Sequence, residues 1–348
     1  MLIRYPNLPQ SIYFFITFHK GSFFEKKNEL EFTHIAEHLL FSGLKDLPTE
    51  KAKEQRERLF SSLSAVTNFN SVSLYGYFPK KNVIPAFQYL HRMIYYWECS
   101  REQWEKEKKM LWKEYQKRKN YGKEYIEMHN LFLKNSQKQY WNQTEIFQEG
   151  PFTTVKKIHT YWNTFIKKAP LQISLIGDIS PKDFRYISKL FSISSPKSTS
   201  KKNWKKEECG KKQKGQKIIL WYKSPQKNVG SFFFEEILKL HIQYPWFLEI
   251  QDYSTFQFPK KIISKIKNPS LKDFSRAHKK LVVGFESLLT GNDWFAFLDQ
   301  ASYIQHHRYL PFNVANIYAF TEKLKKYTFS DYKKWWDETG FEKLLKDV

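Results

Sequence analysis

Residues 32–43 read Phe-Thr-His-Ile-Ala-Glu-His-Leu-Leu-Phe-Ser-Gly, and this stretch is the one that points to a specific chemistry. On a helix, the spacings i, i+3 and i+4 place His34, Glu37 and His38 on one face. Two imidazoles four residues apart can bind one zinc ion, and the carboxylate between them can act as a general base toward a water molecule at the metal. The alternative is a helix whose histidines are hydrogen-bonded and metal-free. A third metal ligand would favour the zinc site.

Residues 98–118 are the best source of that ligand. A catalytic zinc ion takes three protein ligands and leaves one position open. This segment is rich in Glu, Lys, Gln, Trp and Leu and lacks Gly and Pro, which predicts a helix. It offers Glu102, Glu105, Glu107 and Glu114, and its physical chemistry alone does not choose among them. Each could instead be a solvated partner of a neighbouring lysine, which is the favoured interpretation for Glu102 and Glu105.

An ordered series of landmarks resembles the inverzincin peptidases, the family of pitrilysin, insulin-degrading enzyme and the mitochondrial processing peptidases. The resemblance covers residues 12 to about 190. The matching positions, besides the pentapeptide itself, are Phe41 and Gly43, residues 64–82, residues 103–115, and Gly177, Asp178 and Pro181. Together these landmarks are far more specific than five residues.

The resemblance implies roles for individual residues. Glu114 would be the third zinc ligand beside His34 and His38, and Glu37 would be the general base. Glu107 would orient the ligands without binding the metal itself. The substrate would bind along Ser64, Ala65 and Thr67, although the family usually has Asn where Ser64 stands. Backbone pairing of this kind favours extended or unfolded peptides.

The resemblance also implies an α+β fold with two related domains, each a mostly antiparallel sheet packed against helices. We expect a catalytic domain at residues 1–190, a basic flexible linker at residues 191–217, and a shortened, metal-free second domain at residues 218–348. In the family, an Arg and a Tyr of the second half contact substrate. Tyr253 is the candidate for the Tyr, no Arg stands at the right distance, and the favoured alternative is an ordinary strand aromatic. A related subunit in a homo- or heterodimer could supply the pair.

Composition excludes several classes of protein. The chain has 348 residues, enough for two domains with substantial cores. Its two cysteines argue against a disulfide scaffold and fit a reducing compartment. The sequence contains no run of 18 apolar residues and no clear signal peptide, which predicts no membrane span and a cytoplasmic location. It also lacks Gly-rich phosphate loops and Cys-x-x-Cys pairs, so a nucleotide enzyme or a zinc finger finds no support.

The formal net charge of +23 admits two interpretations. A basic balance attracts polyanions or acidic partners, but lysines scattered along amphipathic helices are more often a solvated surface. The solvated surface is favoured over a nucleic-acid groove.

The motif and the resemblance together predict a zinc-dependent endopeptidase that cleaves extended or unfolded peptides. The alternatives are a non-catalytic or partner-dependent subunit of a peptidase dimer and, less favoured, a basic polyanion-binding protein.

Overall fold

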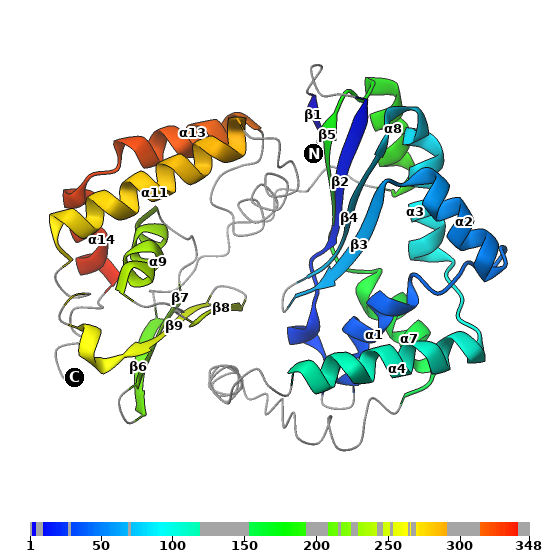
Figure 1. Cartoon of the computed structure of the whole chain (residues 1–348), viewed down its shortest axis with the longest axis horizontal. Coiled ribbons are helices and arrows are strands. Elements are labelled where there is room, and N and C mark those ends of the chain that lie inside the picture. Colours follow the sequence, from blue (N-terminus) through cyan, green and yellow to red (C-terminus); the bar gives the residue numbers. More distant parts are fainter. Residues whose placement is uncertain are drawn as a thin grey trace. The chain divides into compact units, whose positions relative to one another are not determined.

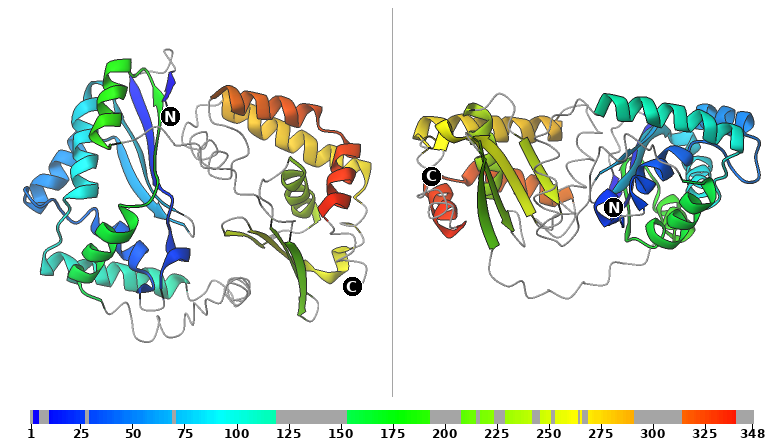
Figure 2. Two further views of the ribbon diagram at one scale, coloured as in Figure 1. Left: turned by 180° about the vertical axis from the view of Figure 1, so that it is seen from behind. Right: turned by 90° about the horizontal axis from the view of Figure 1, so that it is seen from below.

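The chain forms two compact units, Met1–Thr199 and Ser200–Val348, in a computed structural model (Figure 1). The described residues are 2–4, 10–26, 29–68, 71–118, 153–192, 208–214, 217–223, 229–241, 246–250, 253–263, 265, 269–290 and 314–339. Each unit combines one sheet with several helices, as further views also show (Figure 2).

The first unit contains a five-stranded, mostly antiparallel sheet. Its strands are β1 (Leu2–Arg4), β2 (Ser11–Phe18), β3 (Ser62–Thr67), β4 (Val72–Pro79) and β5 (Leu171–Gly177), in the order β1-β5-β2-β4-β3. The pair β1 and β5 is parallel, and the other pairs are antiparallel. Gly76 lets β3 lie close to β4, because a Cβ atom there would overlap the backbone of Ser62. Strand β3, the predicted substrate strand, therefore forms an edge of this sheet.

Helices of the first unit pack on one face of the sheet and around its end (Figures 1 and 2). They are η1 (Ser22–Phe24), α1 (Phe32–Leu39), α2 (Thr49–Leu59), η3 (Lys80–Asn82), α3 (Val83–Tyr95), α4 (Arg101–Arg118), α7 (Val155–Tyr161), the π-helical turn η4 (Trp162–Ile166) and α8 (Pro181–Leu190). The helix predicted at residues 98–118 is confirmed as α4, which begins three residues later than predicted.

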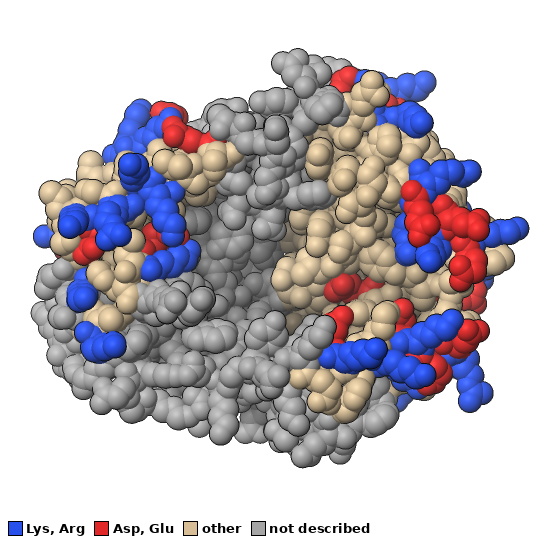
Figure 3. Space-filling view, in the orientation of Figure 1, with Lys and Arg blue, Asp and Glu red and all other residues tan. Residues whose placement is uncertain are grey.

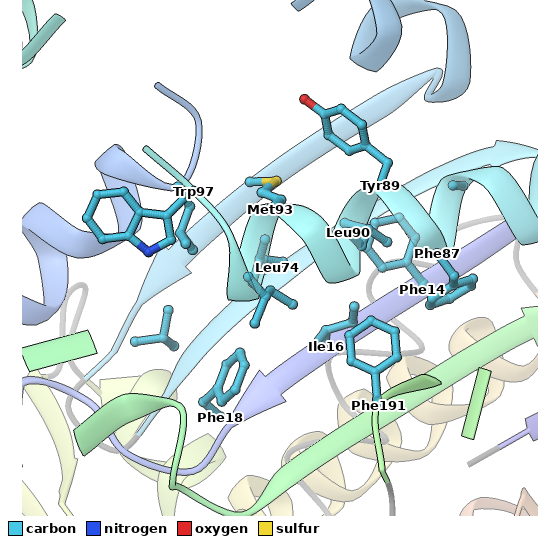
Figure 4. Packing of buried hydrophobic residues seen from close by; sticks show 14 of the residues in the cluster. Phe14, Ile16, Phe18, Leu74, Phe87, Tyr89, Leu90, Met93, Trp97 and Phe191 are labelled. Atoms are coloured by element: carbon cyan, nitrogen blue, oxygen red, sulfur yellow. The ribbon is translucent and has the colours of Figure 1, made fainter. Parts of the chain in front are cut away.

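The core of this unit lies between the sheet and α3 (Figure 4). Alternate residues of β2 point to the same face of a strand, and Phe14, Ile16 and Phe18 are buried on the face that packs against helices. From α3, Phe87 and Leu90 pack against this face, and both are fully buried. This core holds the sheet against the helices that carry the predicted site.

The second unit contains a four-stranded antiparallel sheet. Its strands are β6 (Glu208–Lys214), β7 (Lys217–Lys223), β8 (Trp246–Ile250) and β9 (Tyr253–Pro259), in the order β6-β7-β9-β8. Its helices are α9 (Val229–His241), η5 (Lys260–Ile262), α11 (Leu271–Thr290), α13 (Val314–Lys326) and α14 (Phe329–Thr339). The described buried side chains of α9 include Phe233, Phe234, Ile237 and Leu238.

The two units repeat one arrangement of elements. Apart from η1 and α2, the elements β2-α1-β3-β4-η3-α3 of the first unit follow the same order as β7-α9-β8-β9-η5-α11 of the second. Strands β4 and β9 are each the middle strand of a matching trio. Both series contain Phe-Pro-Lys-Lys where the last strand meets the short helix, at residues 78–81 and 258–261. The predicted α+β fold with two related domains is therefore confirmed, whereas this short repeat was not noticed in the sequence.

The predicted flexible linker is wrong for residues 208–214, which form β6. This strand contains Lys211, Lys212 and Lys214, and the lysines suggested a solvated linker. It lies at the edge of its sheet, where lysines are common because they hinder pairing with another chain. The division between the units falls at Thr199, nine residues after the predicted end of the first domain at residue 190. Residues 193–207 of the predicted linker lie outside the described residues.

Candidate metal centre

Three predicted ligands converge where α1 meets α4. The Nε2 atoms of His34 and His38 lie 3.2 Å apart, as expected for residues on successive turns of one helix face. The Glu114 carboxylate reaches them from α4, with its Oε2 3.4 Å from His34 Nε2 and its Oε1 3.7 Å from His38 Nε2. Among the described residues, these three form the one group of His, Cys, Asp and Glu side chains with metal-binding geometry, and one ligand atom of each lies within 4.8 Å of the others.

This geometry fits a tetrahedral zinc ion. Ligand atoms at 2.0–2.2 Å from such an ion are separated by roughly 3.3–3.5 Å, close to the separations between the three side chains. The histidine tautomers fit as well. His34 Nδ1 lies 3.1 Å from Glu31 Oε2, and His38 Nδ1 lies 3.2 Å from Glu107 Oε2. Because a carboxylate accepts from each Nδ1–H group, the Nε2 atoms of both rings are the ones that face the metal position.

Burial selects the acidic residues of α4 that reach the site. Trp104 and Leu111 are buried and fix the orientation of the helix, and Glu107 and Glu114 lie on this side of it. The seven-residue spacing of Glu107 and Glu114 is close to two helical turns, so both face α1. Two other acidic residues pair with lysines of the same helix, as predicted: Glu102 with Lys106 at 2.7 Å and Glu105 with Lys108 at 2.6 Å.

Glu31 is a site residue that the sequence analysis missed. It precedes α1, is 3% exposed, and accepts a hydrogen bond from His34. Its backbone has φ 65° and ψ 3°, the left-handed region that side chains other than Gly seldom adopt. The available signal was its position three residues before His34, the same i, i+3 spacing that relates His34 to Glu37.

Glu25 holds the start of α1 in place. Its Oε2 accepts a hydrogen bond from the Glu31 backbone N–H at 2.8 Å, and its Oε1 accepts one from the Thr33 N–H at 2.7 Å. The Thr33 hydroxyl also lies 2.9 Å from the Tyr161 hydroxyl of α7. Burial and the nearby Glu31 carboxylate raise the pKa of Glu25 to about 8, and burial raises the pKa of Tyr161. Glu25 was also missed, because it lies outside the helix and no spacing marks it.

Glu37 meets one of the predicted substrate residues, Thr67, at the end of β3. The Thr67 hydroxyl donates a hydrogen bond to Glu37 Oε2 at 2.6 Å, which ties the predicted general base to the sheet edge. Ser64 and Ala65 lie earlier on this edge strand, opposite Tyr75 and Leu74 of β4. Tyr253 begins β9 of the second unit, and its predicted role at the site stays a prediction.

The comparison of the sequence with protein families agrees with this arrangement. The model described as Insulinase (Peptidase family M16) matches residues 6–144, which include both histidines, Glu37 and Glu114. This part of the chain belongs to the insulinase family. No curated protein matches the chain in sequence.

Several solved structures share the fold over nearly the whole length of this chain. The periplasmic protease PqqL from Escherichia coli matches with a TM-score of 0.64 and 14% identity, over 97% of this chain and 45% of PqqL. A protease from Helicobacter pylori matches with a TM-score of 0.68 and 14% identity, over 97% of this chain and 93% of that protein. The peptidase M16 inactive domain from Pseudomonas fluorescens matches with a TM-score of 0.66 and 11% identity, over 98% of this chain and 92% of that domain. The chain thus spans less than half the length of PqqL, and its fold is similar to those of two proteases and an inactive domain.

None of the helices described combines the length and the apolar character that crossing a bilayer requires.

Proposed function

We propose that this insulinase-family chain is a zinc-dependent endopeptidase. The observation that carries the proposal is the convergence of His34, His38 and Glu114 on one point, with Glu37 on the same helix turn. A hydrogen-bonded helix without metal does not require two Nε2 atoms to face each other at 3.2 Å or a carboxylate to approach both.

The side chains have separate tasks in the proposed reaction. When bound, zinc would supply Lewis-acid chemistry, polarising a peptide carbonyl and lowering the pKa of water. His34, His38 and Glu114 would hold the ion, while Glu107 fixes the ring of His38. Glu37 would accept a proton from the attacking water and deliver it to the leaving amine. Its carboxylate is oriented for this by the Thr67 hydroxyl.

The substrate is proposed to be an extended or unfolded peptide that adds to the edge of the sheet at β3. An edge strand offers unpaired backbone N–H and C=O groups to such a peptide. Because β3 ends at Thr67, a peptide paired with β3 would pass beside Glu37. Ser64 and Ala65 would supply pairing positions for the substrate backbone.

The decisive experiment compares the wild type with Glu37→Gln. Bound zinc is measured per chain, and cleavage of an unfolded peptide library is followed by mass spectrometry. We expect about one zinc ion in both proteins and cleavage by the wild type alone. If the wild type binds zinc but does not cleave, alone or with a related subunit, the chain is a non-catalytic member. If neither protein binds zinc, the metal site itself is refuted.

A non-catalytic or partner-dependent subunit is the second candidate. The likeness to an inactive M16 domain favours it, because the same fold occurs without catalysis. A homo- or heterodimer with a related subunit would then complete the site. Mixing the chain with such a subunit should produce cleavage that neither protein shows alone.

Polyanion binding has weaker support. On the face shown in Figure 3, basic side chains of the first unit alternate with acidic ones. On α4, pairs such as Lys106 with Glu102 are exposed and within 2.7 Å, so this surface is a mixed, solvated one. A nucleic-acid ligand would show affinity that falls steeply with salt and does not depend on Glu37.

A further inference from the structure

Glu31 stands at the start of helix α1, but its side chain does not make the hydrogen bond that is usual at that position. Polar side chains at the position before a helix, such as Asp or Ser, usually accept hydrogen bonds from its first N–H groups. The Glu31 side chain makes no such bond. Its carboxylate accepts from the ring of His34 instead, with 3.1 Å between Glu31 Oε2 and His34 Nδ1.

Glu25 takes the capping task in its place. The two oxygens of its carboxylate accept from the backbone N–H groups of Glu31 and Thr33. These bonds hold the Glu31 backbone in its left-handed conformation, with φ 65°. Unfavourable backbone conformations of this kind persist where the surroundings fix them, and they occur often at functional sites. The Glu31 side chain is thereby directed at His34 and away from the helix terminus.

The two metal-binding rings are consequently held alike. Glu31 accepts from His34 Nδ1 at 3.1 Å, and Glu107 accepts from His38 Nδ1 at 3.2 Å. Both carboxylates are largely buried, with side-chain exposures of 4% and 16%, so water competes little for these hydrogen bonds. A carboxylate behind a histidine fixes its tautomer and orientation and strengthens its binding to a metal.

We propose that Glu31 is the positioning residue for His34, matching Glu107 for His38, so that each ring in the metal site has its own carboxylate. The inference rests on the proposed zinc site and adds to it a residue of the turn before the helix. The unfavourable backbone conformation of Glu31 would then serve metal binding, because it directs the side chain at His34, and Glu25 holds that conformation in place.

The test is zinc affinity, measured by competition with a chromogenic chelator, for the wild type, Glu31→Gln, Glu31→Gly and Glu107→Gln. We expect Glu31→Gln and Glu107→Gln each to lose about 10- to 100-fold in affinity. Glu31→Gly removes the carboxylate while suiting the left-handed backbone. It should therefore lose affinity while its melting temperature without metal stays at or above that of the wild type.

Glu29→Gln is the matched control, because Glu29 lies in the same segment and its carboxylate accepts from the Lys26 backbone N–H at 3.2 Å. It should bind zinc like the wild type. The inference is overturned if Glu31→Gly and Glu31→Gln keep wild-type affinity, or if Glu29→Gln loses as much as they do. In both cases the wild type still binds zinc, whereas a wild type that binds none refutes the proposed function itself.

Discussion

The hydrogen bond from Thr67 to Glu37 gives the sharpest prediction for catalysis. At 2.6 Å between Thr67 Oγ1 and Glu37 Oε2, it is a short bond to a carboxylate. Bonds to charged groups contribute about 1.5–3 kcal/mol. If this bond keeps Glu37 aligned in the transition state, Thr67→Val should raise the barrier by about that amount. The expected loss in kcat is about 10- to 100-fold.

Val is suited to this test because it keeps the β-branched shape of Thr and favours a strand. Thr67 lies at the end of β3, opposite Val72 of β4, so the backbone pairing should survive the substitution. Thr67→Ser keeps the hydroxyl and should restore most of the activity. Because neither change touches His34, His38 or Glu114, both variants should bind zinc like the wild type.

The assay is the steady-state cleavage of one fluorogenic peptide, with kcat and KM determined separately and zinc measured per chain. A loss confined to kcat supports the positioning of Glu37. A rise in KM at unchanged kcat would instead assign Thr67 to substrate binding, as the sequence analysis predicted. Wild-type values of both constants for Thr67→Val would refute the reasoning altogether.

Three further predictions concern stability and metal binding. Between pH 4.5 and about 8 the folded protein should keep a proton on Glu25 that the unfolded chain loses. The free energy of unfolding of the metal-free protein should therefore fall as pH rises through this window, by up to about 1.4 kcal/mol per pH unit. In urea unfolding, Glu25→Gln should show a weaker dependence of this free energy on pH. Leu111→Ala should cost about 2–5 kcal/mol in urea unfolding and weaken zinc binding, whereas Met110→Ala, at a 47% exposed side chain, should change stability by less than about 0.5 kcal/mol. Zinc at 100 times its Kd should stabilise the wild type by about 2.7 kcal/mol against thermal unfolding but leave His38→Ala unchanged, and an equal shift in both would place the zinc elsewhere.

Much of the candidate site could be predicted because its parts are local. His34, Glu37 and His38 share a helix face by spacing alone, and the composition of residues 98–118 marks a helix. The choice of Glu114 over its neighbours came from the resemblance to a family. In the structure the same choice follows from Leu111, whose burial sets which side of α4 faces α1.

Glu25, Glu31 and strand β6 could not be recognised from local sequence patterns. Glu25 and Glu31 act through contacts that depend on the path of the chain before α1 and carry no periodic signal. The lysines of β6 resemble those of a solvated linker, because an edge strand and a linker both favour residues that stay in water.

The placing of two histidines and a carboxylate on one helix face could be read from the sequence, since helical periodicity is fixed by local backbone geometry. Which distant carboxylates approach them depends on tertiary packing. Glu114 lies 76 residues beyond His38 in the chain, and its carboxylate lies 3.7 Å from that ring. Such a contact depends on how buried faces of separate elements pack, which no short stretch of sequence encodes.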